Sequence, residues 1–184
     1  MVQPSPPATD RSTLHLRQAT AADDDLLMRL EAGLSGHLRN GRDLSTAMAR
    51  SLALLLLRGR ESAWRVTWPE AQCLVVERGG EVIGRLWADR SGPTWQLLHL
   101  ALLPRHRGRG FGRAALQAWL GEVDAAHAAV ACCLTLRNPF VLQLNAAGFA
   151  THATRRGQVW MARAAAAPAV AVAGWDDPTM ALAA

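Results

Sequence analysis

The sequence predicts one α/β domain, built from strands and helices that alternate along the chain. A chain of 184 residues with 50% hydrophobic content can bury one sizeable core, and its length fits one domain better than two. Stretches that alternate apolar and polar residues are interspersed with stretches that carry leucines at helical spacing. An apolar strand also breaks near Pro104 into a turn rich in glycine and arginine, which then opens a helix.

The N-terminal part of the chain predicts a strand followed by two helices. Residues Thr13–Gln18 alternate like a half-buried strand, and Thr20 can cap a helix whose first turn holds Asp23–Asp25. Acidic residues there complement the helix dipole. A second helix is expected over 43–58, and its leucines are dense enough to line a core or a dimer contact.

The rest of the domain alternates strands with helices and ends in a hairpin. We expect strands over 72–78 and 81–89 around the turn Gly79-Gly80, a strand over 95–103, a helix over 110–123, a strand over 131–136, a helix over 138–147, and strands over 149–155 and 158–163. The domain then spans residues 13–163. It lies between a Pro-rich N-terminus, residues 1–12, which we expect to be disordered, and an Ala-rich C-terminal tail, residues 164–184.

The segment Arg105–Arg113, here called the glycine–arginine loop, has the composition of an anion-binding turn. Backbone N–H groups at a helix N-terminus lack intrahelical partners and lie at the positive end of the helix dipole, so they bind phosphate oxygens. Glycines let a ligand approach the backbone closely, and the interleaved arginines add charged donors. The expected ligand therefore carries several phosphates.

Motif spacing separates three kinds of phosphate-binding loop. A dinucleotide-binding G-x-G-x-x-G would need glycine at Arg113, and a P-loop would need a lysine, which this chain lacks altogether. What remains is R-x-x-G-x-G, formed by Arg107, Gly110 and Gly112 after an apolar strand. This pattern resembles the coenzyme A signature of the GNAT superfamily of N-acetyltransferases.

A second block, Leu134–Phe149, supports the resemblance. The family commonly reads N-P-A-x-x-L-Y-x-x-L-G-F here, and this chain has Asn138-Pro139 at one end and Gly148-Phe149 at the other. Leu144 falls where the tyrosine usually stands, and the chain contains no tyrosine. In the family this tyrosine is thought to protonate the departing coenzyme A thiolate. In this chain either solvent or another donor protonates the thiolate, or the site binds an acyl-CoA without efficient turnover.

The resemblance implies the GNAT fold, with a mixed central sheet of six to seven strands, about four flanking helices and a wedge between splayed strands 4 and 5. Acetyl-CoA would lie in that wedge, with its pantetheine paired to backbone groups of strand 4 and its pyrophosphate on the glycine–arginine loop. The cofactor-binding residues implied are Leu100, Ala101, Leu102, Arg107, Gly108, Arg109, Gly110, Phe111, Gly112, Arg113 and Asn138. For Asn138, capping of its own helix is the alternative role.

The implied reaction is direct attack of a primary amine on the acetyl thioester, which requires removal of a proton from the acceptor. His99, on the strand beside the expected thioester position, is the candidate general base, and Glu81 and Gln96 are weaker candidates. A lone strand histidine is otherwise a structural or surface group. Four tryptophans surround the first hairpin: Trp64, Trp68, Trp87 and Trp95. They can line an acceptor pocket, but we expect at least two of them in the core.

Two other functions stay open at this point. The missing tyrosine is compatible with a catalytically weak acyl-CoA-binding sensor or scaffold. The glycine–arginine loop also superficially resembles a nucleic-acid-binding Arg-Gly segment, but such segments are usually repeated and disordered. The acceptor, a small-molecule or peptide amine, cannot be read from the fold, because one architecture serves many acceptors. A homodimer through the second helix or the tail is likewise left open.

Composition limits the remaining classes of function. The net charge is +5, and four arginines lie in the glycine–arginine loop, so a polyphosphate ligand accounts for the excess without nucleic acid. The three cysteines, two of them adjacent, fit neither a disulfide framework nor metal-ligand spacing, and no metal is expected. Because no stretch reaches the length of a membrane span and the N-terminus lacks the pattern of a signal peptide, we expect a cytoplasmic protein without membrane contact.

Overall fold

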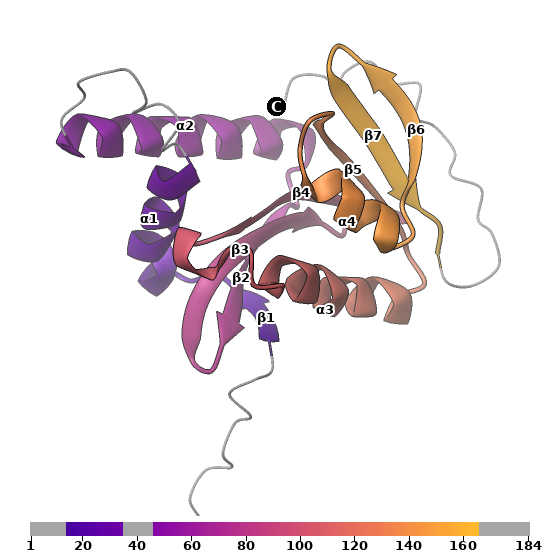
Figure 1. Cartoon of the computed structure of the whole chain (residues 1–184), viewed down its shortest axis with the longest axis horizontal. Helices are drawn as coiled ribbons and strands as arrows, with labels where there is room; N and C mark the ends of the chain where they lie inside the picture. Colours follow the sequence, from indigo (N-terminus) through magenta and orange to yellow (C-terminus); the bar gives the residue numbers. More distant parts are fainter. Residues whose placement is uncertain (1–13, 35–45, 166–184) are drawn as a thin grey trace, which may run out of the picture.

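The computed structural model describes residues 14–34 and 46–165, so the expectations for residues 1–12 and for the tail beyond residue 165 lie outside the described residues. The elements in chain order are β1 (Leu14–Gln18), a 3-10 helix (Ala21–Asp23), α1 (Asp24–Leu34), α2 (Thr46–Thr67), β2 (Gln72–Arg78), β3 (Glu81–Asp89), β4 (Thr94–Leu102), a 3-10 helix (Pro104–His106), α3 (Phe111–Ala125), β5 (Ala129–Thr135), α4 (Phe140–Ala146), β6 (Ala150–Arg155) and β7 (Gln158–Arg163), as Figure 1 shows.

The strands form one seven-stranded mixed sheet with the order β1-β2-β3-β4-β5-β7-β6. β4 and β5 are parallel, and all other neighbouring strands are antiparallel. A parallel pair needs a crossover connection, which α3 supplies between β4 and β5. The mixed sheet and its flanking helices confirm the predicted fold class.

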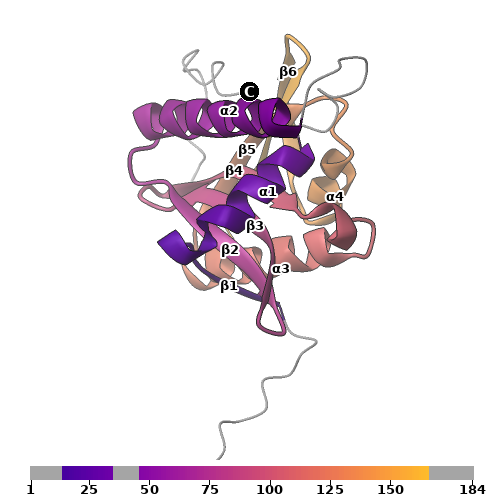
Figure 2. The same ribbon diagram turned by 90° about the vertical axis from the view of Figure 1, so that its left-hand side faces the viewer.

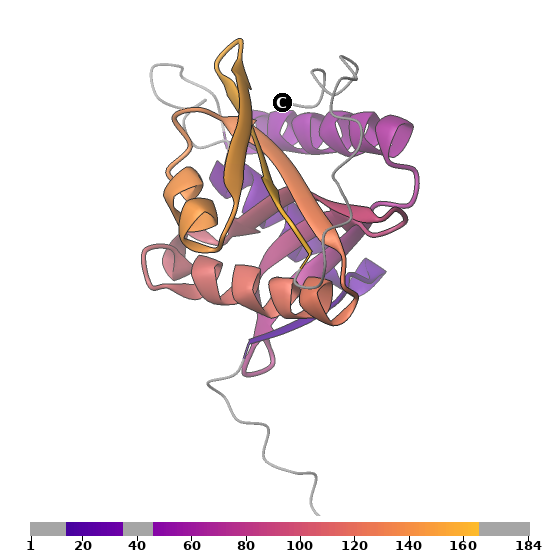
Figure 3. The same cartoon turned by 90° about the vertical axis from the view of Figure 1, so that its right-hand side faces the viewer.

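The helices cover the sheet from its two faces. Figure 2 shows α1 crossing in front of the strands with α2 above it, and Figure 3, from the opposite side, shows α3 and α4 in front. On the α3 face, Leu86 and Leu97 pack with Trp119 in the largest apolar cluster. On the other face, Ala101 packs with Leu30 of α1. Successive side chains of β3 and β4 therefore alternate between two layers.

Helix α2 extends well past its predicted end. The sequence predicts a stop near Arg58, which is wrong: the helix continues through Gly59 to Thr67. One interior glycine costs only about 1 kcal/mol of helix stability relative to alanine. Leu57 and Trp64, both buried, anchor the helix on either side of that glycine. The predicted start at residue 43 lies outside the described residues, and no helix within the described ranges is long and apolar enough to cross a membrane.

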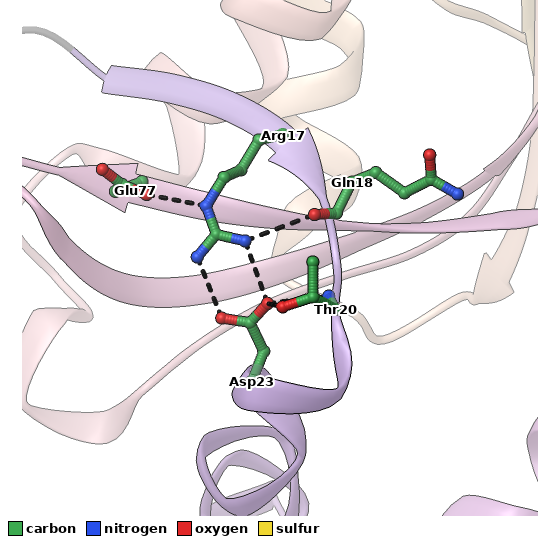
Figure 4. Close-up of polar contacts among 5 residues, drawn as sticks. All are labelled: Arg17, Gln18, Thr20, Asp23 and Glu77. Carbon is green, nitrogen blue, oxygen red and sulfur yellow. Dashed lines mark hydrogen bonds and ion pairs between the residues drawn. The ribbon is translucent and has the colours of Figure 1, made fainter.

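An ion-pair cluster joins β1, β2 and the start of the first helical segment, as Figure 4 shows. Both terminal nitrogens of Arg17 donate to the carboxylate of Asp23 at 2.9 Å, and its Nε donates to Glu77 at 2.8 Å. The backbone N–H of Thr20 also donates to Asp23, at 2.8 Å. These bonds lower the pKa of Asp23, with Arg17 as the largest cause. Asp23 is thus an ion-pair partner, in addition to the helix-dipole role the sequence suggests.

Candidate functional site

β4 and β5 separate part of the way along their length. Their pairing runs from Thr94 opposite Ala129 to Leu97 opposite Cys132. β4 continues to Leu102 and β5 to residue 135, but no described residue of β5 pairs with β4 beyond Leu97. The predicted wedge between strands 4 and 5 is therefore present.

A β-bulge lies where the two strands begin to separate. Trp87 of β3 pairs with His99, but the next residue, Ala88, pairs with Leu97, so Leu98 is an extra residue in β4. A bulge bends its strand and increases the local twist. The bulge therefore changes the course of β4 at the point where its pairing with β5 ends.

The three backbone positions expected to bind pantetheine lie on this separated half of β4. Leu100 and Ala101 pair with Leu86 and Arg85 of β3, and Leu102 pairs with Gly84. Their second strand edge faces the wedge and has no partner strand among the described residues. An extended ligand segment can pair with such an open edge in the way that a peptide adds a strand to a sheet.

Gly84 lets β3 approach this part of β4 closely. A Cβ built on Gly84 would lie 2.4 Å from the carbonyl oxygen of Ala101 and 2.5 Å from a methyl group of Leu102. No side chain larger than hydrogen fits there without movement of the backbone. A glycine inside a strand is the sequence signal for such an approach, although Gly84 was not among the residues predicted to form the site.

The glycine–arginine loop presents a run of unpaired backbone donors at the end of β4. Gly108 and Gly110 have φ values of 68° and 83°, a conformation that favours glycine. Among the described residues, no backbone carbonyl accepts from the N–H groups of Gly108, Arg109 or Gly110. The N–H groups of residues 111–113 open α3 ahead of its first bond, from Ala114 to the carbonyl of Gly110 at 3.1 Å. This geometry suits phosphate oxygens.

The arginines of the loop divide into two groups. Arg107 donates from Nε to the carbonyl of Leu102 at 2.8 Å, and Arg105 donates to Glu81 at 2.5 Å. These two side chains hold the loop against the sheet. Arg109 lies over the ring of Phe111, and Arg113 is exposed on the first turn of α3. The second pair remains at the surface beside the unpaired N–H groups.

His99 lies on the face of β4 that α1 and α2 cover, beside two buried tryptophans. It pairs with Trp87 across the sheet, and its ring centroid is 5.7 Å from that of Trp64. Burial, together with the smaller effect of the positive charges of Arg85 and Arg60, lowers its pKa from 6.5 to about 3. The imidazole is therefore neutral at physiological pH. Trp64 and Trp87 are both 2% exposed, which confirms that at least two of the four tryptophans are in the core.

A buried network of charges next to His99 was not predicted from the sequence. Arg85 donates to Glu31 of α1 at 2.8 Å, and Arg60 of α2 approaches the other oxygen of Glu31 at 3.3 Å. Arg85 also lies 3.6 Å from Glu61 of α2. Burial lowers the pKa of Arg85 and raises that of Glu61. The network ties α1 and α2 to β3.

The helix after β5 carries the two remaining positions singled out from the sequence. The side chain of Asn138 accepts a hydrogen bond from the N–H of Phe140 at 2.9 Å. Asn138 therefore caps the start of α4, which is the alternative to cofactor binding that the sequence left open. Leu144 is 1% exposed and packs in the main core with Trp119 and Phe149. It contributes no titratable group to the wedge.

Comparisons with known proteins support the fold and its family. The family model described as "Acetyltransferase (GNAT) family" matches residues 48–158, more than half of the chain. No curated protein matches. The structure of the PaiA N-acetyltransferase from Thermoplasma acidophilum in complex with coenzyme A has a TM-score of 0.60 at 14% identity, covering 83% of this chain and 99% of that one.

Two further solved structures have the same fold. The ribosomal-protein-S18-alanine N-acetyltransferase from Escherichia coli has a TM-score of 0.57 at 13% identity, covering 86% of this chain and 99% of that one. YncA, a putative acetyltransferase from Salmonella typhimurium solved with acetyl-CoA, has a TM-score of 0.53 at 20% identity, covering 87% of this chain and all of that one.

Proposed function

Because the chain belongs to the GNAT acetyltransferase family, we propose that it transfers an acetyl group from acetyl-CoA to a primary amine by direct attack. One observation carries the proposal: the open edge of β4 leads directly into the run of unpaired N–H groups of the glycine–arginine loop. A ligand with an amide-containing arm and a pyrophosphate matches both parts.

The binding roles follow from which backbone groups are unpaired. Residues 108–113 bind the pyrophosphate oxygens through their N–H groups, and Arg109 and Arg113 add charge at the surface. Leu100, Ala101 and Leu102 pair with the pantetheine amides through the open edge of β4. Phe111 supports the loop because Arg78 and Arg109 both lie over its ring. Asn138 acts through its cap of α4.

The chemistry then needs one stabilising contact and two proton transfers. The amine nitrogen attacks the thioester carbonyl, the carbon–sulfur bond breaks, and the thiolate leaves. A backbone N–H on the open half of β4 stabilises the developing oxyanion. His99 is the proposed acceptor of the proton that the amine nitrogen loses: its imidazole is neutral and has a free lone pair, but its lowered pKa makes it a weaker base than a free imidazole. Solvent protonates the thiolate, since Leu144 has no proton to donate and a thiolate is basic enough to take a proton from water yet weak enough to leave without a general acid.

The proposal includes an acceptor that approaches from the α1 and α2 side, past His99 and the charged network. Solved relatives of the fold include an enzyme named for a ribosomal-protein alanine and one named for spermidine, so the fold alone does not choose between peptides and small amines. A cytoplasmic location and a homodimer complete the proposal. A non-catalytic acyl-CoA sensor is the second candidate, because Leu144 is buried in the core.

The test is mass-spectrometric detection of acetylated product from acetyl-CoA and a panel of amines: spermidine, lysine, alanine amide and an alanyl tripeptide. Amine-dependent product, lost in Gly110→Asp and kept in Gly157→Asp, supports the transferase. The two glycines have similar φ values, 83° and 78°, and an added Cβ meets nothing within 4 Å at either, so the control matches the backbone strain. Acetyl-CoA binding without any product favours the sensor, and absence of binding rejects both.

A further inference from the structure

The outer face of α2 carries exposed apolar side chains. Four of the six large hydrophobic residues that are exposed in the described part of the chain belong to this helix: Met48, Leu55, Leu56 and Val66. Leu55 is 68% exposed and Val66 is 85% exposed. Exposed apolar residues that gather on one element mark interaction sites more often than scattered ones do.

Three of these residues, Met48, Leu55 and Val66, belong to a line of α2 with coiled-coil spacing. Positions that alternate by four and three residues lie along one line of an α-helix. On α2 this line, here called the α2 seam, consists of Met48, Leu52, Leu55, Gly59, Ser62 and Val66. The seam carries no charge, and its only interruptions are the small residues Gly59 and Ser62. Figure 1 shows α2 along the outer side of the molecule, with α1 and the sheet beneath it.

The opposite side of α2 is already used within the domain. Leu57 and Trp64 are buried there. Arg60 reaches Glu31 and Glu61 lies near Arg85, so these charges turn toward the sheet. The helix thus has one line of residues committed to the core and a second, uncharged line that faces away. An ordinary surface helix places its charged residues on that outer face.

Building on the homodimer that forms part of the proposed function, we propose that the α2 seam is its interface, in which the seam packs antiparallel against the α2 seam of the second copy across a twofold axis. The order of large and small residues supports this occupant, because the seam is complementary to itself. When two copies run antiparallel, Leu55 of each lies opposite Gly59 of the other, and Leu52 lies opposite Ser62. The two leucines of the seam then each face a small residue, and at the ends Met48 of one copy meets Val66 of the other. Such isologous packing is typical of twofold dimers.

The size of the seam sets the expected strength of the dimer. A helix of 22 residues is about 33 Å long, so one helix pair buries less than the roughly 800 Å² per partner of a standard interface. Arg58 borders the seam, and its long side chain can carry its charge into solvent. We therefore expect a reversible dimer with a dissociation constant in the micromolar range.

The test is sedimentation velocity of the full chain over a concentration series from about 1 to about 200 μM. Gly59→Leu is the informative variant, because it fills the space that Leu55 of the second copy needs. It should not harm folding, since leucine favours helix more than glycine does and an added Cβ at residue 59 meets nothing within 4 Å. Gly121→Leu is the matched control on α3, an exposed helical glycine that likewise has open space around it.

The proposal predicts a concentration-dependent dimer for the wild type and for Gly121→Leu, and at least a tenfold higher dissociation constant for Gly59→Leu. Leu55→Glu should raise the dissociation constant at least as much. A wild type that stays monomeric up to the highest concentration overturns the proposal, and the seam then belongs to another segment or to a different partner. Dimerisation of Gly59→Leu with wild-type strength overturns it as well.

Discussion

The Nε of Arg107 donates a hydrogen bond to the main-chain carbonyl of Leu102, at 2.8 Å. This contact joins the glycine–arginine loop to the last residue of the open half of β4. The sequence assigns Arg107 to the cofactor through the R-x-x-G-x-G pattern, and the structure adds that its side chain holds the loop in place. Its contribution to binding is then partly indirect, because it sets where the unpaired N–H groups point.

We expect Arg107→Ala to weaken acetyl-CoA binding about fivefold, because losing one hydrogen bond of about 1 kcal/mol releases the loop. Isothermal titration calorimetry measures this directly. Arg155→Ala, an exposed arginine on β6, removes the same charge away from the loop and should bind like the wild type. Equal weakening in both variants would show that overall charge, and not the Arg107 contact, matters.

Gly84→Ala should lower the free energy of unfolding by about 1 to 3 kcal/mol, the usual cost of overpacking. The added Cβ would lie 2.4 Å from the carbonyl oxygen of Ala101, which cannot move without shifting β4. Denaturant unfolding followed by circular dichroism gives the value. Gly121→Ala, with open space around residue 121, should instead gain up to about 1 kcal/mol of helix propensity. An unchanged stability for Gly84→Ala would contradict the close approach of the two strands.

The ion pair of Arg17 with Asp23 predicts an acid-dependent loss of stability. The folded pKa of Asp23 lies below the usual 3.8, chiefly because Arg17 donates to it. Its stabilisation is therefore present above about pH 3.8 and is lost as the pH falls toward the folded pKa. Asp23→Asn should cost about 1 to 2 kcal/mol at pH 7, a range kept low because Arg17 is 41% exposed.

For Asp23, the measurement is urea unfolding of the wild type and Asp23→Asn between pH 7 and pH 2. The difference in unfolding free energy between the two proteins should shrink below about pH 4, where the unfolded carboxyl binds a proton. A constant difference over the whole range would mean that the charge of Asp23 contributes nothing.

His99 predicts a second pH effect, in a different window. Its pKa falls from 6.5 in the unfolded chain to about 3 in the folded one, mainly by burial. Between these two pKa values the imidazole carries a proton in the unfolded state but not in the folded one. The free energy of unfolding therefore falls by at most about 1.4 kcal/mol for each pH unit below 6.5. His99→Gln should lose less stability than the wild type between pH 6 and pH 4. Identical slopes would place the imidazole in solvent.

Most elements could be predicted because their boundaries depend on local chemistry. All four residues of the turns Gly79-Gly80 and Arg156-Gly157 have positive φ, a conformation that glycine adopts most readily. The hairpins β2–β3 and β6–β7 turn at these two pairs, as the sequence predicts. The glycine–arginine loop was recognisable for the same reason, since the conformations of Gly108 and Gly110 favour glycine. Local signals of this kind do not require knowledge of distant contacts.

What could not be predicted depends on tertiary contacts. An arginine in a strand suggests an exposed position, and the carboxylates of Glu31 and Glu61, which lie on two separate helices, explain why Arg85 is fully buried. The bulge at Leu98 leaves no sequence signal, because the apolar run continues through it. The end of α2 could not be predicted because its last turns are held by a tertiary contact. Trp64 packs against Trp87, which lies 23 positions further along the chain.

The central claim is that the glycine–arginine loop binds the phosphates of acetyl-CoA, and calorimetric titration of acetyl-CoA into the wild type and Gly110→Asp tests it most directly. Aspartate at this position adds bulk and negative charge among the unpaired N–H groups. The account predicts micromolar binding by the wild type and by Gly157→Asp, and a loss of at least a hundredfold in Gly110→Asp. No binding by the wild type, or equal binding by a folded Gly110→Asp, would contradict it.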